Sequence, residues 1–281
     1  MQTLLNTPHE IIQQNILGAA AKARTRILNI LVLGMMAGSF IAMGAQSSSL
    51  AVHNISNIGL ARTLAGCIFP VGLMMIVFVG GELFTGDCMM SMAWMQRKIH
   101  FADMLRTLVL VYVSNFVGAA LIAFLVAHSG QYDYSSGALG AYTIKVAYGK
   151  VHSSFANALV SGILCNILVC VAVLMAAAAK DIAGKVLAIF FPILAFVVSG
   201  FEHCVANMYY IPAGIFASKN AAYAAKALEL YNIDSTQLSS LNWGSFAISN
   251  LIPVTIGNII GGALLVGGAC FYLHGKALHE S

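Results

Sequence analysis

Long apolar stretches separated by short polar segments dominate the chain. A helix needs about 20 mostly apolar residues to cross the roughly 30 Å hydrocarbon core of a bilayer. Four stretches meet this length: Ile27–Ala45, Thr107–Ala127, Phe155–Ala179 and Phe246–Leu273. Each of them is predicted to span a membrane as one helix.

Two further apolar stretches are interrupted. Thr63–Val79 runs into Gly80-Gly81-Glu82, and the shorter Val186–Ser199 runs into Gly200-Phe201-Glu202-His203; both become apolar again afterwards. Backbone that leaves the helix at membrane depth is tolerated only where it faces protein or a water-filled cavity. The pattern therefore predicts six spans, of which the second and the fifth are broken.

The composition supports a membrane solvent. Of 281 residues, 59% are hydrophobic and 9% are charged, whereas soluble domains carry about 25% charged residues. So few charges cannot cover a surface that faces water, which excludes most soluble enzymes, nucleic-acid binders and disordered tails. The net charge of +4 is too small to indicate a polyanionic partner. The six cysteines lack metal or redox spacing, so they are interpreted as buried free thiols and no cofactor is expected.

Basic residues indicate the orientation. Six spans place both termini on one side, which would carry nine of the fourteen basic residues, so both termini are predicted to be cytoplasmic. The polar start of the chain does not resemble a signal peptide, and Ile11–Ala23 is predicted to form a helix along the membrane surface. The expected organisation is an amphipathic segment over residues 1–26, a six-span domain over 27–273 and a cytoplasmic tail over 274–281.

The chain also contains a weak internal repeat. Phe-Pro pairs at 69–70 and 191–192 precede Glu82 and Glu202, respectively, and an Asn-x-x-Gly-x-Ala-Leu pattern occurs at 115–121 and again at 258–264. Each half reads as span, broken span, span, over about 27–128 and 153–273. Three spans per half is an odd number, so the second half must be inverted in the membrane. The polar insertion Ser218–Trp243 is predicted to be an external loop.

The two helix breaks hold the strongest candidates for chemistry. At the first break, Glu82 and Asp87 are best explained as caps for the following half-helix, whereas the Thr85 hydroxyl could donate to a passing anion. At the second break, a histidine at mid-membrane depth, His203, is expensive to bury and titrates near neutral pH. A satisfied core imidazole is the plainer interpretation of a lone histidine, but its place at one of two matching breaks favours function.

Other candidates have ordinary explanations when taken alone. Lys150 could be an interfacial lysine that extends its amine to water. Phe69, Leu73, Phe84 and Phe196 could be core packing, and Asn258 is expected to bond between helices.

Three motifs together resemble the formate/nitrite transporter family. They are Gly-Glu-Leu-Phe-Thr-Gly at 81–86, Ser-Gly-Phe-Glu-His at 199–203 with Ala-Asn-Met at 206–208, and Ile-Pro-Val-Thr-Ile-Gly-Asn-Ile-Ile-Gly-Gly at 252–262. The resemblance covers nearly the whole chain. It implies an all-α, aquaporin-like fold with an inverted 3+3 repeat, assembled as a homopentamer in the cytoplasmic (inner) membrane, with one pathway per protomer for small monovalent weak-acid anions.

The resemblance also implies roles for individual residues. Thr85 and His203 match the pair between two constrictions, Lys150 matches a lysine that attracts anions, and Asn166 matches a polar residue near the histidine. Glu82, Glu202 and Asn207 would support the breaks. The cytoplasmic constriction would be Leu83, Phe84 and Val169, and the periplasmic one Phe69, Leu73 and Phe196.

The expected partners are small anions, protons, membrane lipid and other copies of the chain. Proton transfer from His203 would neutralise the anion, which gives pH-dependent coupling, although polarisation by His203 alone is an open alternative. The first break resembles nitrite and hydrosulfide transporters, whereas the sixth span resembles formate channels, and formate ranks first. A membrane redox protein is the alternative of another class, but only His203 lies deep in a span. An aquaporin would need Asn-Pro-Ala motifs, which the chain lacks.

Overall fold

The computed structural model describes residues 5–275 and is helical in the way the apolar pattern predicts. Six helical segments are long and apolar enough to cross a membrane. The unbroken ones are α2 (Ile27–Val52), α7 (Phe101–Ala127), α9 (Phe155–Ala178) and the final span Trp243–Gly275, which comprises α14 (Trp243–Ser245), η3 (Phe246–Leu251), α15 (Ile252–Ile259), η4 (Ile260–Val266), α16 (Gly267–Cys270) and η5 (Phe271–Gly275). The protein is a multi-pass membrane protein of the all-α class.

The second and fifth spans are broken, as predicted. The second comprises α3 (Ile58–Ile68) and α4 (Val71–Val79), leaves the helix at Gly80 and resumes as α5 (Phe84–Asp87), η1 (Cys88–Met90) and α6 (Ser91–Met95). The fifth is α10 (Ile182–Ser199), a break from Gly200 and then α11 (Cys204–Ser218). Gly80 and Gly200 have φ of 101° and 70°, in the region that favours glycine. Both breaks therefore depend on the glycine that begins them.

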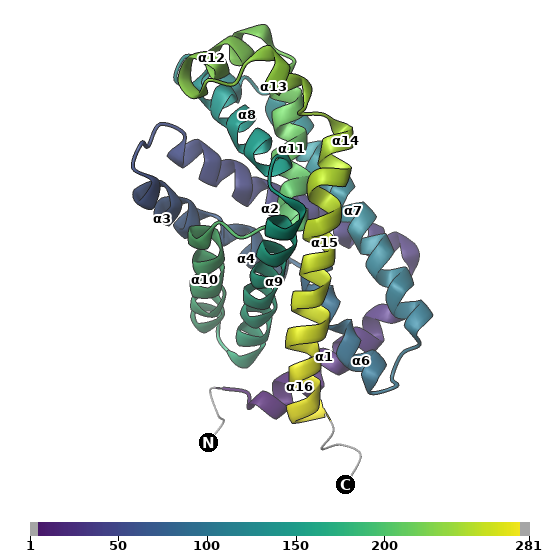
Figure 1. Ribbon diagram of the computed structural model, residues 1–281. Coiled ribbons are helices and arrows are strands. Elements are labelled where there is room, and N and C mark those ends of the chain that lie inside the picture. Colours follow the sequence, from purple (N-terminus) through teal and green to yellow (C-terminus); the bar gives the residue numbers. More distant parts are fainter. Residues whose placement is uncertain (1–4, 276–281) are drawn as a thin grey trace.

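Both chain ends lie at one end of the helix bundle, here called the terminal side (Figure 1). The helix α1 (Pro8–Ala23) lies there, capped by Thr7, whose side chain accepts from Glu10 N. The preceding segment is held to α9, since Asn6 N donates to Ala178 O over 2.9 Å. The opposite end, called the distal side, carries η2 (Gln131–Asp133), α8 (Ala138–Val151), α12 (Ala221–Tyr231) and α13 (Ser235–Ser239). Residues 276–281 of the predicted tail lie outside the described residues.

The inverted repeat is visible in matching hydrogen bonds at the two breaks. Asn115 donates through Nδ2 to Gly34 O and Glu82 O, and its Oδ1 accepts from Phe84 N. Asn258 makes the same three bonds in the second half, to Gly162 O, Glu202 O and Cys204 N. One buried amide thus satisfies the freed backbone on both sides of each break.

Glycines bring the first and third spans of each half into close contact. A Cβ added at Gly118 of α7 would lie 2.0 Å from Met35 O of α2, and one added at Gly261 would lie 2.3 Å from Ile163 O of α9. Small residues at a crossing let two backbones approach closely, which is a common way to pack helices in lipid. The crossings occupy matching places in the repeat.

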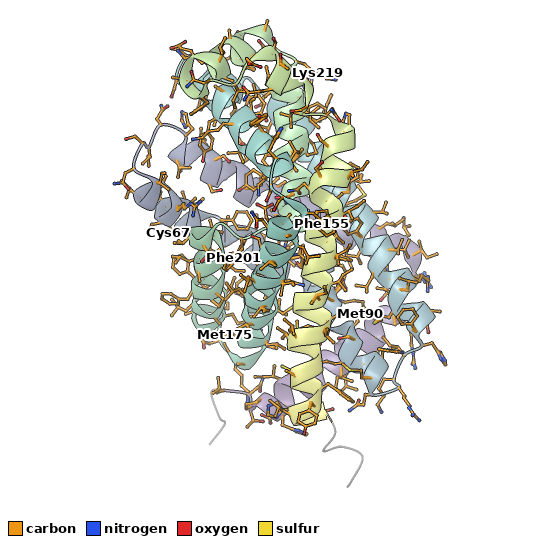
Figure 2. The ribbon with its side chains drawn as sticks, viewed as in Figure 1. Cys67, Met90, Phe155, Met175, Phe201 and Lys219 are labelled. Atoms are coloured by element: carbon orange, nitrogen blue, oxygen red, sulfur yellow. The ribbon has the colours of Figure 1, made fainter. Side chains whose placement is uncertain are left out.

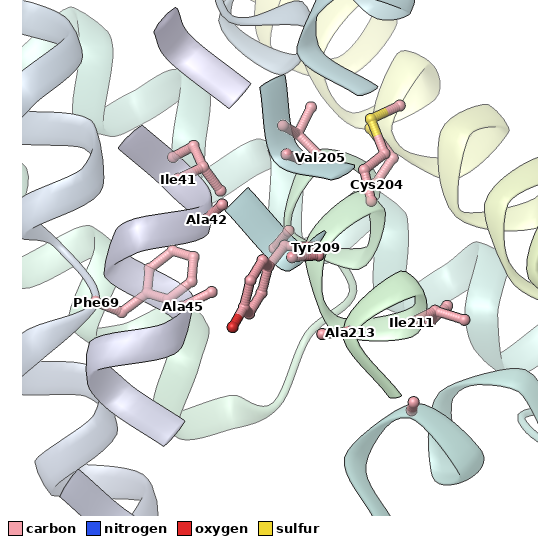
Figure 3. Packing of buried hydrophobic residues seen from close by; sticks show 14 of the residues in the cluster. Ile41, Ala42, Ala45, Phe69, Cys204, Val205, Tyr209, Ile211 and Ala213 are labelled. Atoms are coloured by element: carbon pink, nitrogen blue, oxygen red, sulfur yellow. The ribbon is translucent and has the colours of Figure 1, made fainter. Parts of the chain in front are cut away.

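The two halves meet in a buried core near the middle of the bundle. Figure 3 shows Ile41, Ala42 and Ala45 of α2 facing α11, with the Tyr209 ring between the helices. The Tyr209 hydroxyl donates to Gln46 Oε1, so the polar tip of this buried ring has a partner.

The outer surface of the spans carries exposed apolar side chains, as lipid requires (Figure 2). Met175 of α9 is one of them. Four cysteines are buried free thiols as expected, but Cys67 on α3 is exposed and Cys270 is half-buried. The interpretation of all six as buried was therefore wrong for Cys67, because the pattern of a short apolar span does not show which face it buries.

The distal side contains helices that the hydrophobic pattern did not predict. The insertion Ser218–Trp243, expected to be a loop, contains α12 and α13, and α12 packs against α8. The helix α8 buries Leu139, Ile144 and Ala147 although it is too short to span a membrane. Together these helices cover the distal end of the bundle.

Candidate functional site

Thr85 and His203 come together at the centre of the molecule. The Thr85 hydroxyl lies 2.9 Å from His203 Nε2, both side chains are buried, and each belongs to one of the two breaks. His203 also caps α11, since its Nδ1 accepts from Ala206 N over 3.0 Å. A backbone N–H can only donate, so Nδ1 carries no proton here. The imidazole is therefore neutral, and its Nε2–H donates to Thr85 Oγ1.

Asn166 acts behind Thr85. Its Nδ2 donates to Thr85 O over 3.1 Å and to Asn258 O over 2.6 Å, and Cys170 Sγ also contacts Thr85 O. Asn166 is completely buried. It therefore holds the backbone of Thr85 against the sixth span.

Two cavities approach the Thr85–His203 pair from opposite sides. A distal cavity of about 240 Å³ is lined by His203, Phe69, Phe196, Arg62 and Lys150. A terminal-side cavity of about 370 Å³ has a lining that includes Leu73, Leu83, Lys22, Glu82 and Asp87. His203 lines the distal cavity, whereas Thr85 is fully buried and lines neither cavity. The line from one cavity to the other through this pair is called the path below.

The predicted constriction residues are distributed unevenly between these cavities. Phe69 and Phe196 line the distal cavity and contact each other edge to face, with ring centroids 5.4 Å apart. Leu73 lines the terminal-side cavity together with Leu83. Phe84 is buried against Tyr112, with ring centroids 4.8 Å apart. The predicted grouping of Leu73 with Phe69 and Phe196 in one constriction stays a prediction.

Val169 belongs to the same buried core. It lies on α9 with 2% of its surface exposed, and it is not among the residues lining either cavity. Its predicted role in a constriction stays a prediction.

The distal lysine is part of a hydrogen-bonded cluster. Lys150 Nζ lies 2.9 Å from Glu202 Oε1 and 5.3 Å from the centroid of the Tyr210 ring. The other carboxylate oxygen of Glu202 accepts from Asn207 Nδ2 over 2.6 Å, and Asn250 Nδ2 is 3.4 Å away. Glu202 and Asn207 are thus hydrogen-bonded to each other at this break, and their predicted support of it stays a prediction. The charge of Lys150 is balanced by its partner, however.

A second lysine occupies the equivalent place on the terminal side. Lys22 of α1 forms ion pairs with both Glu82 and Asp87. Burial alone would lower the pKa of Lys22, but the two carboxylates outweigh burial and raise it. The lysine is therefore charged throughout the physiological pH range. Glu82 and Asp87 are its counter-ions, whereas α5 has Leu83 at its N-cap position and no side-chain cap.

This contact was not predicted from the sequence, although the spacing of the two lysines is a signal for it. Lys22 precedes Gly34 by twelve residues, and Lys150 precedes Gly162 by twelve. Because Gly34 O and Gly162 O accept the equivalent asparagine bonds, the two lysines stand at equivalent places in the repeat.

Arg62 is another residue that the pattern did not single out. It lies on α3 and its guanidinium rests against the second break, since a Cβ added at Gly200 would lie 3.3 Å from Arg62 Nη2. It lines the distal cavity, and it also lines a wider outer cavity of about 690 Å³ together with Lys145. Arg62 forms no ion pair with a carboxylate of residues 5–275. The distal side therefore presents an uncompensated cation beside the path.

Comparison with known proteins agrees with this geometry. The family pattern described as "Formate/nitrite transporter" matches residues 9–272. The chain is 38% identical over 272 residues to "Uncharacterized transporter YrhG" of Bacillus subtilis, covering 96% of this chain and 94% of the relative. It is 36% identical to "Formate channel FocA" of Haemophilus influenzae over 251 residues, covering 89% and 88% of the two chains.

A solved structure shows the same fold. The chain superposes on a "Pentameric formate channel with formate bound" with a TM-score of 0.78 and 31% identity, covering 89% of this chain and 98% of that one. The relatives are channels and transporters, which excludes the enzyme class and leaves the redox alternative without support. The chain belongs to the formate/nitrite transporter family.

Proposed function

We propose that this protein passes formate across the cytoplasmic membrane through each of its subunits. The observation that carries the proposal is the buried Thr85–His203 hydrogen bond between two cavities that open on opposite sides. Relatives named formate channels share the fold and over a third of the sequence. A small, planar anion could exchange its hydrogen bonds with water for those of Thr85 and His203.

Dehydration is the main obstacle on such a path. An unpaired anion among Phe69, Phe196 and Leu83 would lose its hydration at a cost of several kcal/mol or more. The Thr85 hydroxyl and the Nε2–H of His203 can replace part of that hydration. The site therefore suits an anion that can also become neutral, which a weak acid does by taking up a proton.

We propose that His203 supplies this proton when the pH is low. A second proton on Nδ1 would displace the Ala206 N–H that Nδ1 now accepts, and it would make Nε2–H a stronger acid. Transfer of the Nε2 proton to formate then forms an O–H bond, leaves a neutral imidazole and produces formic acid. The neutral acid crosses the remaining apolar residues at low cost.

The test is uptake of formate, nitrite and hydrosulfide into lipid vesicles, measured side by side across external pH. The informative variant is His203→Asn, because asparagine can still cap α11 but cannot take up a proton. We expect formate to be fastest in the unmodified protein. We expect the variant to lose acid-driven uptake but to keep a pH-independent anion leak. If acid-driven uptake survives, proton transfer by His203 is wrong; if none of the three anions moves, the proposed function is wrong.

One observation favours a second candidate within the family. The first break reads Gly-Glu-Leu-Phe-Thr-Gly-Asp, which resembles nitrite and hydrosulfide transporters. Nitrite or hydrosulfide fluxes above that of formate in the same experiment would support this candidate.

We further propose that five copies assemble, with the terminal side in the cytoplasm. The exposed apolar residues around the spans would be shared between lipid and neighbouring copies, and the terminal side carries the larger number of basic residues. The mass of the complex in native mass spectrometry, compared with the 29.7 kDa chain, tests the assembly. Accessibility of a cysteine introduced at Lys98 or Lys219 tests the orientation.

A further inference from the structure

The two breaks differ at one acidic position. In the second half, Asn207 follows Glu202 by five residues and donates to its carboxylate. In the first half, the residue five places after Glu82 is Asp87. Three other positions match between the halves: the lysine (Lys22 and Lys150), the glutamate (Glu82 and Glu202) and the asparagine that bonds across the break (Asn115 and Asn258). The first half therefore has a second carboxyl group where the second half has an amide.

The second carboxyl group is buried beside the first. Lys22 Nζ contacts both Glu82 and Asp87, which makes the two carboxyl groups neighbours. Only 5% of the surface of Asp87 is exposed, and its Oδ2 is buried with no hydrogen-bond partner in residues 5–275. An acceptor oxygen in this position is left unsatisfied unless it carries a proton or meets water in the cavity.

The surrounding elements supply no further compensating charge. The terminal-side cavity is lined from α1 by Gln14, Asn15 and Lys22, and from α4 and α9 by apolar side chains. Among its described lining residues only Lys22, Glu82 and Asp87 are charged. The nearby ionisable groups are the thiols of Cys88 and Cys170, which are buried and neutral.

The charge of this cluster decides whether an anion can approach. Two carboxylates and one ammonium leave a negative charge at the mouth of the proposed path, where it would repel formate. Two carboxyl groups that share one site do not both ionise readily, because each charge opposes the other. With one proton the cluster becomes neutral, like the distal cluster of Lys150, Glu202 and Asn207.

We propose that Glu82 and Asp87 bind one proton between them, at a site on the terminal side that is distinct from His203. The proton exchanges with water in the terminal-side cavity. When the pH on that side rises and the proton leaves, the mouth becomes negative and anion flux falls. The effect on flux rests on the proposed function, whereas the proton site itself does not.

Infrared spectroscopy of the purified protein tests the proton site directly. A protonated carboxyl group absorbs at a frequency separate from that of a carboxylate, and the band shifts in heavy water. We expect such a band at neutral pH in the unmodified protein, and its loss in both Asp87→Asn and Glu82→Gln. Asp87→Asn copies the natural arrangement around Asn207 and should fold. A band that is absent from the unmodified protein, or unchanged in both variants, overturns the proposal.

The reverse exchange is the matched control. Asn207→Asp places a second carboxyl group beside Glu202 and Lys150, so it is expected to add a second protonated carboxyl band. No added band in a folded Asn207→Asp variant would also overturn the argument, because the same geometry would then hold two carboxylates.

Flux measurements test the consequence. In vesicles with uniformly oriented protein, formate flux is expected to fall several-fold as the pH on the terminal side alone is raised, and Asp87→Asn should remove this dependence. A dependence that persists unchanged in Asp87→Asn contradicts the assigned role. If the unmodified protein moves no formate, the proposed function fails, while the infrared bands still decide whether the proton site exists.

Discussion

At the scale of single residues, the site arises where the two halves stop matching. Asn115 and Asn258 hold equivalent backbone groups, and the residue between those groups is Leu83 in the first half and His203 in the second. The same scaffold therefore presents an apolar side chain on one side of the centre and a hydrogen-bond donor on the other. This exchange makes the centre of the path asymmetric, although the backbone around it is repeated.

The two scaffold asparagines should contribute similarly to stability. Asn258→Ala removes three buried hydrogen bonds and leaves their backbone partners unsatisfied at the second break. We expect the free energy of unfolding to fall by about 2 kcal/mol, and by a similar amount for Asn115→Ala. Thermal unfolding in detergent measures this, with the exposed helix cap Asn242→Ala as the control. Midpoints for the two buried variants no lower than that of Asn242→Ala would contradict the role given to the asparagines.

Arg62 should set the attraction of anions to the distal mouth, because Glu202 already balances Lys150. Arg62→Gln is expected to raise the half-saturating formate concentration about threefold while the maximal rate changes little, since one exposed charge acts mainly on the approach of the anion. Salt should reduce the difference. Lys219→Gln removes a positive charge from the same face outside the distal cavity and is the matched control. An equal rise in both variants would assign the effect to net charge alone.

The sequence predicted some of these residues and not others, for a physical reason. His203 and Thr85 were found because a polar residue within an apolar span is costly, so its presence carries information. Lys22 and Arg62 lie in segments where basic residues are ordinary. Their roles depend on what the ends of long side chains reach, and this is fixed only when α1 and α3 pack against the breaks.

At the scale of elements, glycine-mediated crossings fix how the spans approach one another. The crossings of α2 with α7 and of α9 with the sixth span leave no room for a Cβ, as the distances at Gly118 and Gly261 show. Because the asparagine scaffolds lie on these same helices, the crossings also set the position of the breaks.

Adding one methyl group at a crossing should therefore be severe. Gly118→Ala and Gly261→Ala would force apart helices that carry Asn115 and Asn258, and each is expected to lower the free energy of unfolding by more than about 2 kcal/mol. Gly268→Ala is the matched control, since nothing lies within 4 Å of a Cβ added there. Unfolding midpoints measured in detergent should fall for the first two and stay level or rise for the third. Equal midpoints in all three variants would refute the close-packing argument.

The helices that cross the membrane could be predicted from the sequence, because lipid requires them to be apolar. The six spans and both breaks follow from hydropathy and glycine, because membrane depth leaves few alternatives. The helices α8 and α12 were not found. Their burial comes from packing on each other and on α11, the second part of the fifth span, so the segments have mixed composition rather than a long apolar run.

At the scale of the whole molecule, the repeat is larger than three spans. The helix α1 precedes α2 as α8 precedes α9, and each carries a lysine that pairs with the glutamate of a break. We therefore propose that each repeat begins with a short helix outside the span, which extends the halves beyond the predicted 27–128 and 153–273. The two short helices then close equivalent clusters on the terminal and distal sides.

This view predicts what happens when the terminal-side lysine is lost. Lys22→Met leaves the half-buried Glu82 and the buried Asp87 without a counter-charge and is expected to lower the free energy of unfolding by about 3 kcal/mol at neutral pH. The deficit should shrink as the pH falls, because protonated carboxyl groups need no counter-charge. Thermal unfolding in detergent at several pH values measures it, with the exposed Lys98→Met as the control.

Removing the two carboxyl groups should restore the stability that Lys22→Met loses. Combining Lys22→Met with Glu82→Gln and Asp87→Asn removes every charge from the cluster, so most of the lost stability should return and the pH dependence of the deficit should disappear. If the combined variant stays as unstable as Lys22→Met alone, α1 is held by its packing rather than by this ion pair. Rescue, in contrast, would mean that Lys22 on α1 mainly compensates the carboxylates of Glu82 and Asp87, as Lys150 on α8 compensates Glu202.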